Sequence, residues 1–153
     1  MEGQFIESAY GPFVAALRDG HFVAPPEGWS AEEVAAHVAI NNDLIATVAE
    51  AIAAGDQPSY DNSAAVDIAQ LRAYVTRFGD TESLATAVEQ SARRLAAAAQ
   101  ALDEVSSARE LQVRIVDNGD VVRDSPVAIG EFIKGNASFH LNIHLEQLTS
   151  LQS

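Results

Sequence analysis

Cysteine is absent from this chain of 153 residues, which excludes disulfide bonds, thiolate metal sites and a cysteine nucleophile. Basic residues are scarce: nine Lys and Arg stand against 22 Asp and Glu, giving a net charge of −13. Because nucleic acids and anionic membrane surfaces are bound through basic side chains, we expect neither as a partner. The sequence also lacks a run of roughly 20 apolar residues that could cross a bilayer and a recognisable signal peptide. We therefore expect a cytoplasmic protein.

Aromatic residues are also few, at 7% of the chain, although hydrophobic residues reach 48%. The apolar content is therefore mostly Ala, Leu, Val and Ile, which is typical of a helical bundle. We expect an all-α fold in a single domain over residues 1–153, long enough to bury a real core. Apolar residues recur at helical spacing in four long stretches and one short one. These predict bundle helices over about 6–17, 30–54, 80–105 and 126–151, with a short extra helix over about 64–78.

Several of these helices have clear boundary signals. The second has the clearest start, because Ser30 and Glu33 are spaced as a capping box. Pro12 lies within the first helix and predicts either a kink or a new start there. Ser125-Pro126 predicts the start of the last helix, with proline at the first helical position.

The segment before the last helix has a different period. From Leu111 to Ile115 apolar and polar residues alternate, and Asn118-Gly119 is a strong two-residue turn signal. These features predict a small β-hairpin over about 110–125. With Asn118-Gly119 as the loop, Arg114 faces Arg123 across the strands, which weakens this register.

The chemistry of the chain is concentrated in its histidines. His140 and His144 are four residues apart in a helical pattern, so their imidazoles lie about 40° apart on one face, one turn above the other. Such a pair can bind one metal ion, and His37 on the inward stripe of the second helix is the candidate third ligand. Imidazole suits Zn, Ni or Fe. Asn41 and Asn136 lie one turn from these histidines and are candidates to support the site or face a substrate.

Other interpretations of these residues remain open. The three histidines can be packing groups of an ordinary core, and His21 lies in a proline-rich loop as a surface group. Trp29, which precedes the Ser30 cap, is interpreted as a staple against Val34. Because metal ligation needs neutral imidazoles, a three-histidine site predicts that metal affinity falls below about pH 6.

Two motifs resemble those of the DinB-like superfamily, which includes the N-terminal domain of mycothiol-dependent maleylpyruvate isomerase and the bacillithiol transferases. They are Gly28-Trp29-Ser30-x-x-Glu33-x-x-x-His37 and His140-x-x-x-His144-x-x-Gln147-Leu148. The resemblance covers essentially the whole chain in the order and spacing of helices. It implies a four-helix bundle of up-down-down-up topology with a divalent metal held by His37, His140 and His144.

The resemblance also implies a function. In the family, open metal positions are thought to activate a thiol, often one of low molecular weight, for transfer or isomerisation, and many members are dimers. We therefore expect a metal-dependent thiol S-transferase or isomerase with a small-molecule substrate, forming a homodimer. The alternative is a non-catalytic metal- or ligand-binding dimeric bundle of the same fold. The helical pattern of the last helix places Ile143 on the inward side. Many relatives carry another His or a carboxylate at this position, so the resemblance assigns no catalytic base. Because the sequence continues only a few residues beyond the last predicted helix, we expect no second domain of the kind found in the maleylpyruvate isomerase.

Overall fold

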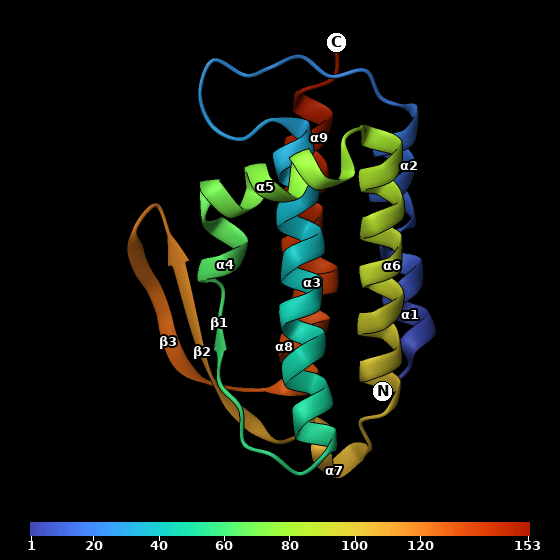
Figure 1. Ribbon diagram of the computed structural model, residues 1–153. Coiled ribbons are helices and arrows are strands. Elements are labelled where there is room, and N and C mark those ends of the chain that lie inside the picture. Colours follow the sequence, from blue (N-terminus) through green and yellow to red (C-terminus); the bar gives the residue numbers. More distant parts are fainter.

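Four long helical stretches packed side by side form the body of the protein in the computed structural model, which describes residues 1–153. Figure 1 shows the first and last stretches running in one direction and the two middle stretches in the other. The fold is mostly helical, as predicted, with one small sheet beside the bundle. The stretches are α1 (Gly3–Ala9) with α2 (Gly11–Asp19), α3 (Ala31–Ala53), α6 (Thr81–Gln100), and α8 (Ile129–Gly135) continuing through the π-helical η1 (Asn136–His140) into α9 (Leu141–Ser150).

The boundary signals act largely as predicted. The first stretch breaks at Tyr10, immediately before Gly11-Pro12 begins α2. At the start of α3 the Ser30 hydroxyl accepts a hydrogen bond from the Glu33 amide at 3.1 Å, and the Glu33 carboxylate accepts one from the Ser30 amide at 2.9 Å. This reciprocal capping box satisfies two backbone donors that the first turn leaves free and fixes the start of the helix that carries His37.

Shorter helices connect the long ones. They are α4 (Ser63–Val66), α5 (Ile68–Phe78) and α7 (Glu104–Ser107). The short extra helix predicted near 64–78 is therefore two helices, separated at Asp67, which caps α5 by accepting a hydrogen bond from the Ala69 amide at 2.9 Å. No helix combines the length and apolar character needed to cross a membrane.

The sheet extends the predicted hairpin. Strands β2 (Glu110–Asp117) and β3 (Asp120–Ala128) pair antiparallel, and β1 (Tyr60–Asp61) adds a short parallel strand beside β2. The prediction that Ser125-Pro126 starts the last helix is wrong, because Pro126 pairs with Gln112 and β3 continues to Ala128. Proline is tolerated there because β3 is an edge strand, so its missing N–H interrupts no central ladder.

The hairpin register also differs from the simple one. A bulge between Ile115 and Val116 shifts the pairing, so Arg114 lies opposite Asp124, and Arg123 lies opposite Ile115. The unfavourable Arg–Arg pair is thereby replaced by a pair of opposite charge. Buried Leu111 and Val113 identify the inner face of β2, which packs toward the helices.

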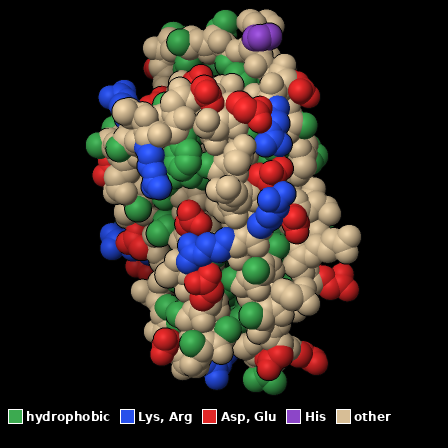
Figure 2. All heavy atoms as spheres, turned by 45° about the vertical axis from the view of Figure 1, so that its right-hand side comes forward, with side chains coloured by type: hydrophobic (Ala, Val, Ile, Leu, Met, Phe, Trp, Pro, Cys, Tyr) green, Lys and Arg blue, Asp and Glu red, His purple; other side chains and the backbone are tan.

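Ion pairs cover much of the surface of α6. Arg18 lies 3.0 Å from Glu82, Arg93 lies 3.4 Å from Glu89, and Arg94 lies 3.0 Å from Glu50. Figure 2, which brings the α6 side of the molecule forward, shows basic and acidic side chains intermixed over this face. These pairs are solvent-exposed, so each adds little to stability, and they involve three of the nine basic side chains of the protein.

Candidate metal site

Three histidines from two helical stretches converge inside the bundle. His37 comes from the second turn of α3, His140 ends the π-helical segment, and His144 lies in α9. The Nε2 atom of His140 is 3.4 Å from Nε2 of His37 and 3.0 Å from Nε2 of His144. One ligand atom from each ring lies within 4.8 Å of the other two. The cluster predicted from the sequence is therefore assembled, and it can hold a metal ion.

The other nitrogen of each ring contacts an oxygen atom. Nδ1 of His37 is 2.6 Å from the Ala65 carbonyl oxygen, Nδ1 of His140 is 3.1 Å from Asn136 Oδ1, and Nδ1 of His144 is 3.0 Å from Gln147 Oε1. A carbonyl oxygen can only accept, so hydrogen bonding here places the proton of each neutral ring on Nδ1. The tautomers follow from these partners, and all three Nε2 atoms are left as unprotonated acceptors.

Three inward lone pairs fit a cation. Without one, the Nε2 atoms face each other with no proton between them, which leaves buried acceptors without donors. With Zn–N distances of 2.0–2.1 Å, neighbouring ligands of a tetrahedral ion are roughly 3.4 Å apart, close to the separations of His140 Nε2 from the other two Nε2 atoms. The pattern of an Nδ1–H held by oxygen and a free Nε2 is also how metal-binding histidines are usually oriented.

Burial keeps the imidazoles neutral. It lowers the pKa of His37 from 6.5 to about 3, helped by the neighbouring His144 charge, and it lowers the pKa of His140 to about 4 for the same two reasons. Burial also lowers the pKa of His144, partly offset by the hydrogen bond to Gln147. The site therefore stays in its ligating form in more acidic solution than the pH of about 6 expected for ordinary histidines.

A buried polar network stands behind His140. Asn136 Oδ1, which contacts His140, also accepts a hydrogen bond from Asn41 Nδ2 at 3.0 Å, and Asn136 Nδ2 donates to the Tyr10 hydroxyl at 2.9 Å. Tyr60 donates to Asn41 Oδ1. Asn136 contacts His140 directly, and Asn41 is linked to it through Asn136, so both amides belong to a polar network beside the histidines. The two tyrosines were not predicted, because nothing in their spacing relates them to the histidines.

Trp29 is a site residue that the sequence analysis assigned another role. Its ring centroid lies 4.9 Å from that of His37 and 6.4 Å from that of His144, with the latter rings stacked. The indole covers one side of the histidine cluster and reduces its contact with water. The signal available in the sequence was that the only tryptophan of the chain directly precedes the cap of the helix that carries His37.

Two cavities meet at the histidines. One, of about 350 Å³, is lined by His37 and His140 together with Asn136 and residues of the hairpin; the other, of about 450 Å³, reaches Trp29 and His144. Both are bordered by Ile115 and Ile143. Asn62 fixes the hairpin beside them, because it exchanges hydrogen bonds of 2.7 and 3.1 Å with the backbone of Val116.

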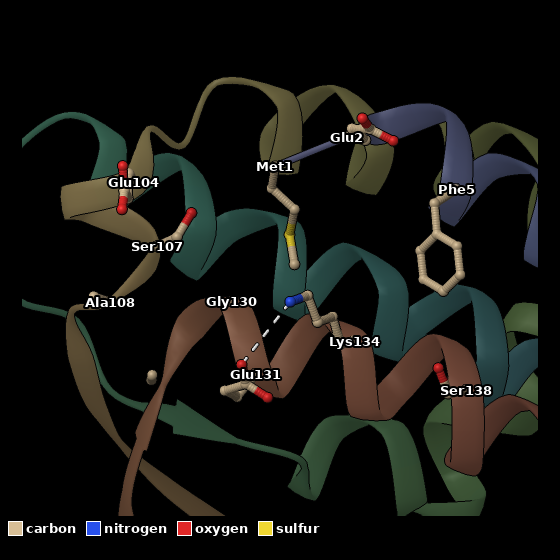
Figure 3. Close-up of a pocket in the computed structure, with 11 residues that line it drawn as sticks. Met1, Glu2, Phe5, Glu104, Ser107, Ala108, Gly130, Glu131, Lys134 and Ser138 are labelled. Carbon is tan, nitrogen blue, oxygen red and sulfur yellow. Dashed lines mark ion pairs between the residues drawn. The ribbon is translucent and has the colours of Figure 1, made fainter.

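A larger cavity lies elsewhere in the molecule. It has a volume of about 760 Å³ and is lined by the N-terminus, α7 and α8, including Phe5, Ser107 and Lys134. Figure 3 shows these side chains around it, with Lys134 directed toward Glu131. The three histidines that could hold a metal ion do not line it; they border the two smaller cavities.

Ile143 and His21 lie outside the histidine cluster; the predicted exposure is wrong for Ile143 and correct for His21. Ile143 was expected to face inward with its neighbours but is 60% exposed at the mouth of both cavities. His21 is exposed in the loop before α3, as predicted.

Comparisons with protein-family models, with curated proteins and with solved structures found no match to this chain.

Proposed function

We propose that this chain is a metal-dependent enzyme of the DinB-like superfamily that acts on a small molecule, as a thiol S-transferase or an isomerase. The observation that carries the proposal is the convergence of three Nε2 atoms beside adjoining cavities, each on a ring whose Nδ1 contacts an oxygen atom. His37, His140 and His144 would hold a divalent ion such as Zn, Ni or Fe. Such an ion supplies a Lewis acid, which lowers the pKa of a coordinated thiol or water.

The protein's own groups hold and shield the ligands. The Ala65 carbonyl, Asn136 and Gln147 each accept the Nδ1 proton of one histidine and so fix the ring that carries it. Trp29 packs against two of the rings and excludes water from that side. The cavity beside His37 and His140 leaves room for a substrate or a low-molecular-weight thiol. Ordered ligands and restricted water are what metal-assisted catalysis requires of a protein.

Membership of the DinB-like superfamily is supported by the order of elements. The directions of the four helical stretches in Figure 1 agree with an up-down-down-up bundle. The residues of the two resembling motifs occupy the start of α3 and the C-terminal helical stretch, and the three histidines within them come together.

Metal content provides the first test. The purified protein should contain, or take up, about one equivalent of Zn, Ni or Fe, because three imidazoles form one site. His140→Ala should lose it, since His140 supplies the Nε2 atom that lies 3.4 Å from that of His37 and 3.0 Å from that of His144. His21→Ala removes an exposed histidine and serves as the matched control. A protein that binds no metal while all three histidines are intact would overturn the proposal.

Activity provides the second test. A panel of low-molecular-weight thiols and electrophiles, assayed with and without the bound metal, should show metal-dependent turnover that His140→Ala abolishes. A specific observation favours the alternative of a non-catalytic metal- or ligand-binding protein: none of the three imidazoles forms an ion pair with a carboxylate, so no acid–base partner is evident. That alternative predicts metal binding without turnover of any thiol adduct.

A further inference from the structure

The inner face of the hairpin changes character as it approaches the histidines. From the base of the hairpin, the inner face carries Leu111 opposite Val127, then Val113 opposite Ser125, then Ile115 opposite Arg123. On this face β2 carries only apolar side chains, whereas β3 changes from valine through serine to arginine toward the turn. Arg123 lines the cavity of about 350 Å³ that also contains His37 and His140.

Arg123 lacks an acidic partner. Five of the nine basic side chains are in ion pairs, namely Arg18, Arg72, Arg93, Arg94 and Lys134, but no carboxylate oxygen lies within 4.0 Å of Arg123. Its side chain makes one hydrogen bond, from Nε to the Ser125 hydroxyl at 3.2 Å. This bond orients the guanidinium and leaves the N–H groups of both terminal nitrogens available to a ligand. In a protein of net charge −13, such an unpaired cation beside the candidate site is a distinctive feature.

The remaining charges of the cavity restrict the ligand. Glu131 is its only carboxylate, and Glu131 Oε1 lies 3.9 Å from Lys134 Nζ on the side shown in Figure 3. No second Lys or Arg lines the cavity, so it suits one negative charge better than the two of a phosphate monoester. A planar guanidinium matches a carboxylate in bidentate geometry. Phe132, Phe139 and Ile143 supply apolar surface for the rest of the molecule.

We infer that Arg123 forms an anion subsite and that the substrate of the proposed metal site is a small organic acid with one carboxylate and an apolar body. The carboxylate binds the guanidinium of Arg123 at the hairpin end of the cavity, and the apolar body lies along Phe139 and Ile143 toward the histidines. The inference rests on the proposed function only in calling this ligand a substrate. Binding of the acid by Arg123 does not require the metal and is measured separately from it.

Phenylacetate and its neutral amide, phenylacetamide, are suitable probes. The full chain, labelled with ¹⁵N, is titrated with each by NMR, once with EDTA and once with one equivalent of Zn²⁺. Phenylacetate should shift the Arg123 Nε–H signal and bind more tightly than the amide. Arg123→Gln should weaken phenylacetate binding by about tenfold or more, the range for hydrogen bonds to a charged group, and leave phenylacetamide binding unchanged. Arg123→Lys, which keeps the charge without the planar fork, should give an intermediate affinity.

Arg114→Gln is the matched control. It removes the same charge from the same hairpin, but Arg114 lies on the opposite face of β2, across from Asp124. The control should bind phenylacetate as the unaltered protein does, which separates a local contact from a change in net charge. Both positions are exposed, and thermal unfolding of each variant verifies that it is folded.

Two results would overturn the inference. One is equal phenylacetate affinity in Arg123→Gln and the unaltered protein; the other is no shift at about 10 mM, above the millimolar range of weak binding. Metal binding is measured independently of the NMR titration, through the fluorescence of Trp29. Trp29 is the only tryptophan, and its ring packs on His37. Quenching by Ni²⁺ should be the same in Arg123→Gln. If Ni²⁺ binds to neither protein, the proposed function fails, whereas the carboxylate measurement in EDTA still decides the inference.

Discussion

Acid should destabilise the metal-free protein through its buried histidines. In the unfolded chain their pKa is about 6.5, whereas burial lowers the pKa of His37 to about 3 and that of His140 to about 4. Between these values the unfolded state binds more protons than the folded state, so stability rises with pH. The contribution is fully present above about pH 6.5 and is lost as the pH falls toward the folded-state values.

The size of the effect follows from the pKa shifts. At pH 5 an unfolded imidazole is almost fully protonated while the folded ones remain neutral, so His37 should lower the unfolding free energy by about 2 kcal/mol relative to pH 7. His140 is less buried and should contribute somewhat less. The sum of about 3 to 4 kcal/mol is a large fraction of the 5–15 kcal/mol typical of a domain.

Urea unfolding in EDTA at pH 7, 6 and 5 measures this loss. Carboxylates that titrate in the same range would contribute too, so the informative quantity is the difference between proteins. His37→Asn keeps a side-chain N–H near the position of Nδ1, where it can donate to the Ala65 carbonyl, but it does not titrate. Its loss of stability from pH 7 to pH 5 should be smaller by about 2 kcal/mol, whereas His21→Asn should behave as the unaltered protein. Equal pH dependence in all three would refute the reasoning.

Three further outcomes are expected. Zn²⁺ at one hundred times its dissociation constant should stabilise the protein by about 2.7 kcal/mol, seen as a rise in Tm that EDTA reverses and that His140→Ala lacks. Asn136→Ala should cost about 2–3 kcal/mol by leaving buried polar partners unsatisfied and should weaken metal binding by about 10–100-fold, measured by urea unfolding and metal titration; exposed Asn142→Ala is the control. Gly119→Ala should destabilise by about 1–2 kcal/mol because the turn requires φ +82° there, whereas Gly11→Ala, in a helix with open space around the new methyl group, should be neutral or stabilising in the same assay.

Local signals in the sequence predicted much of the architecture. Ser30 with Glu33 and the Asn118-Gly119 turn lie where their patterns indicated, because caps and tight turns depend on a few neighbouring residues. The start of the last helix was wrong because Pro126 suits both a first helical turn and an edge strand. Pairing with Gln112 on the neighbouring strand decides between them. The short strand β1 depends on the same long-range pairing, which local patterns do not contain.

The candidate site shows a similar division. The spacing of His140 and His144 predicts their proximity, and the inward stripe of α3 predicts the burial of His37, because both follow from helical geometry. The acceptor of the His37 proton is a backbone carbonyl of Ala65, and any residue type can supply one. Trp29 and Arg123 reach the site through loop and hairpin geometry. Sequence reasoning therefore identifies the candidate ligands more readily than the groups that orient them.

The π-helical segment explains how Asn136, His140 and His144 act together. Four residues overshoot one α-helical turn by about 40°, so three positions at this spacing would drift by about 80° around a regular helix. A π turn is wider, with bonds from i to i+5, so each residue rotates the chain by less. The π-helical segment from Asn136 to His140 thus reduces the angle by which these side chains diverge around the helix axis. Asn136 can therefore contact His140 while His140 faces His144. The same rotation changes the direction of the side chains that follow, so Ile143 lies at the mouth of the cavities instead of in the core. A helical wheel with a single period cannot represent this change, so the burial predicted for Ile143 fails at the same place where the site gains its alignment.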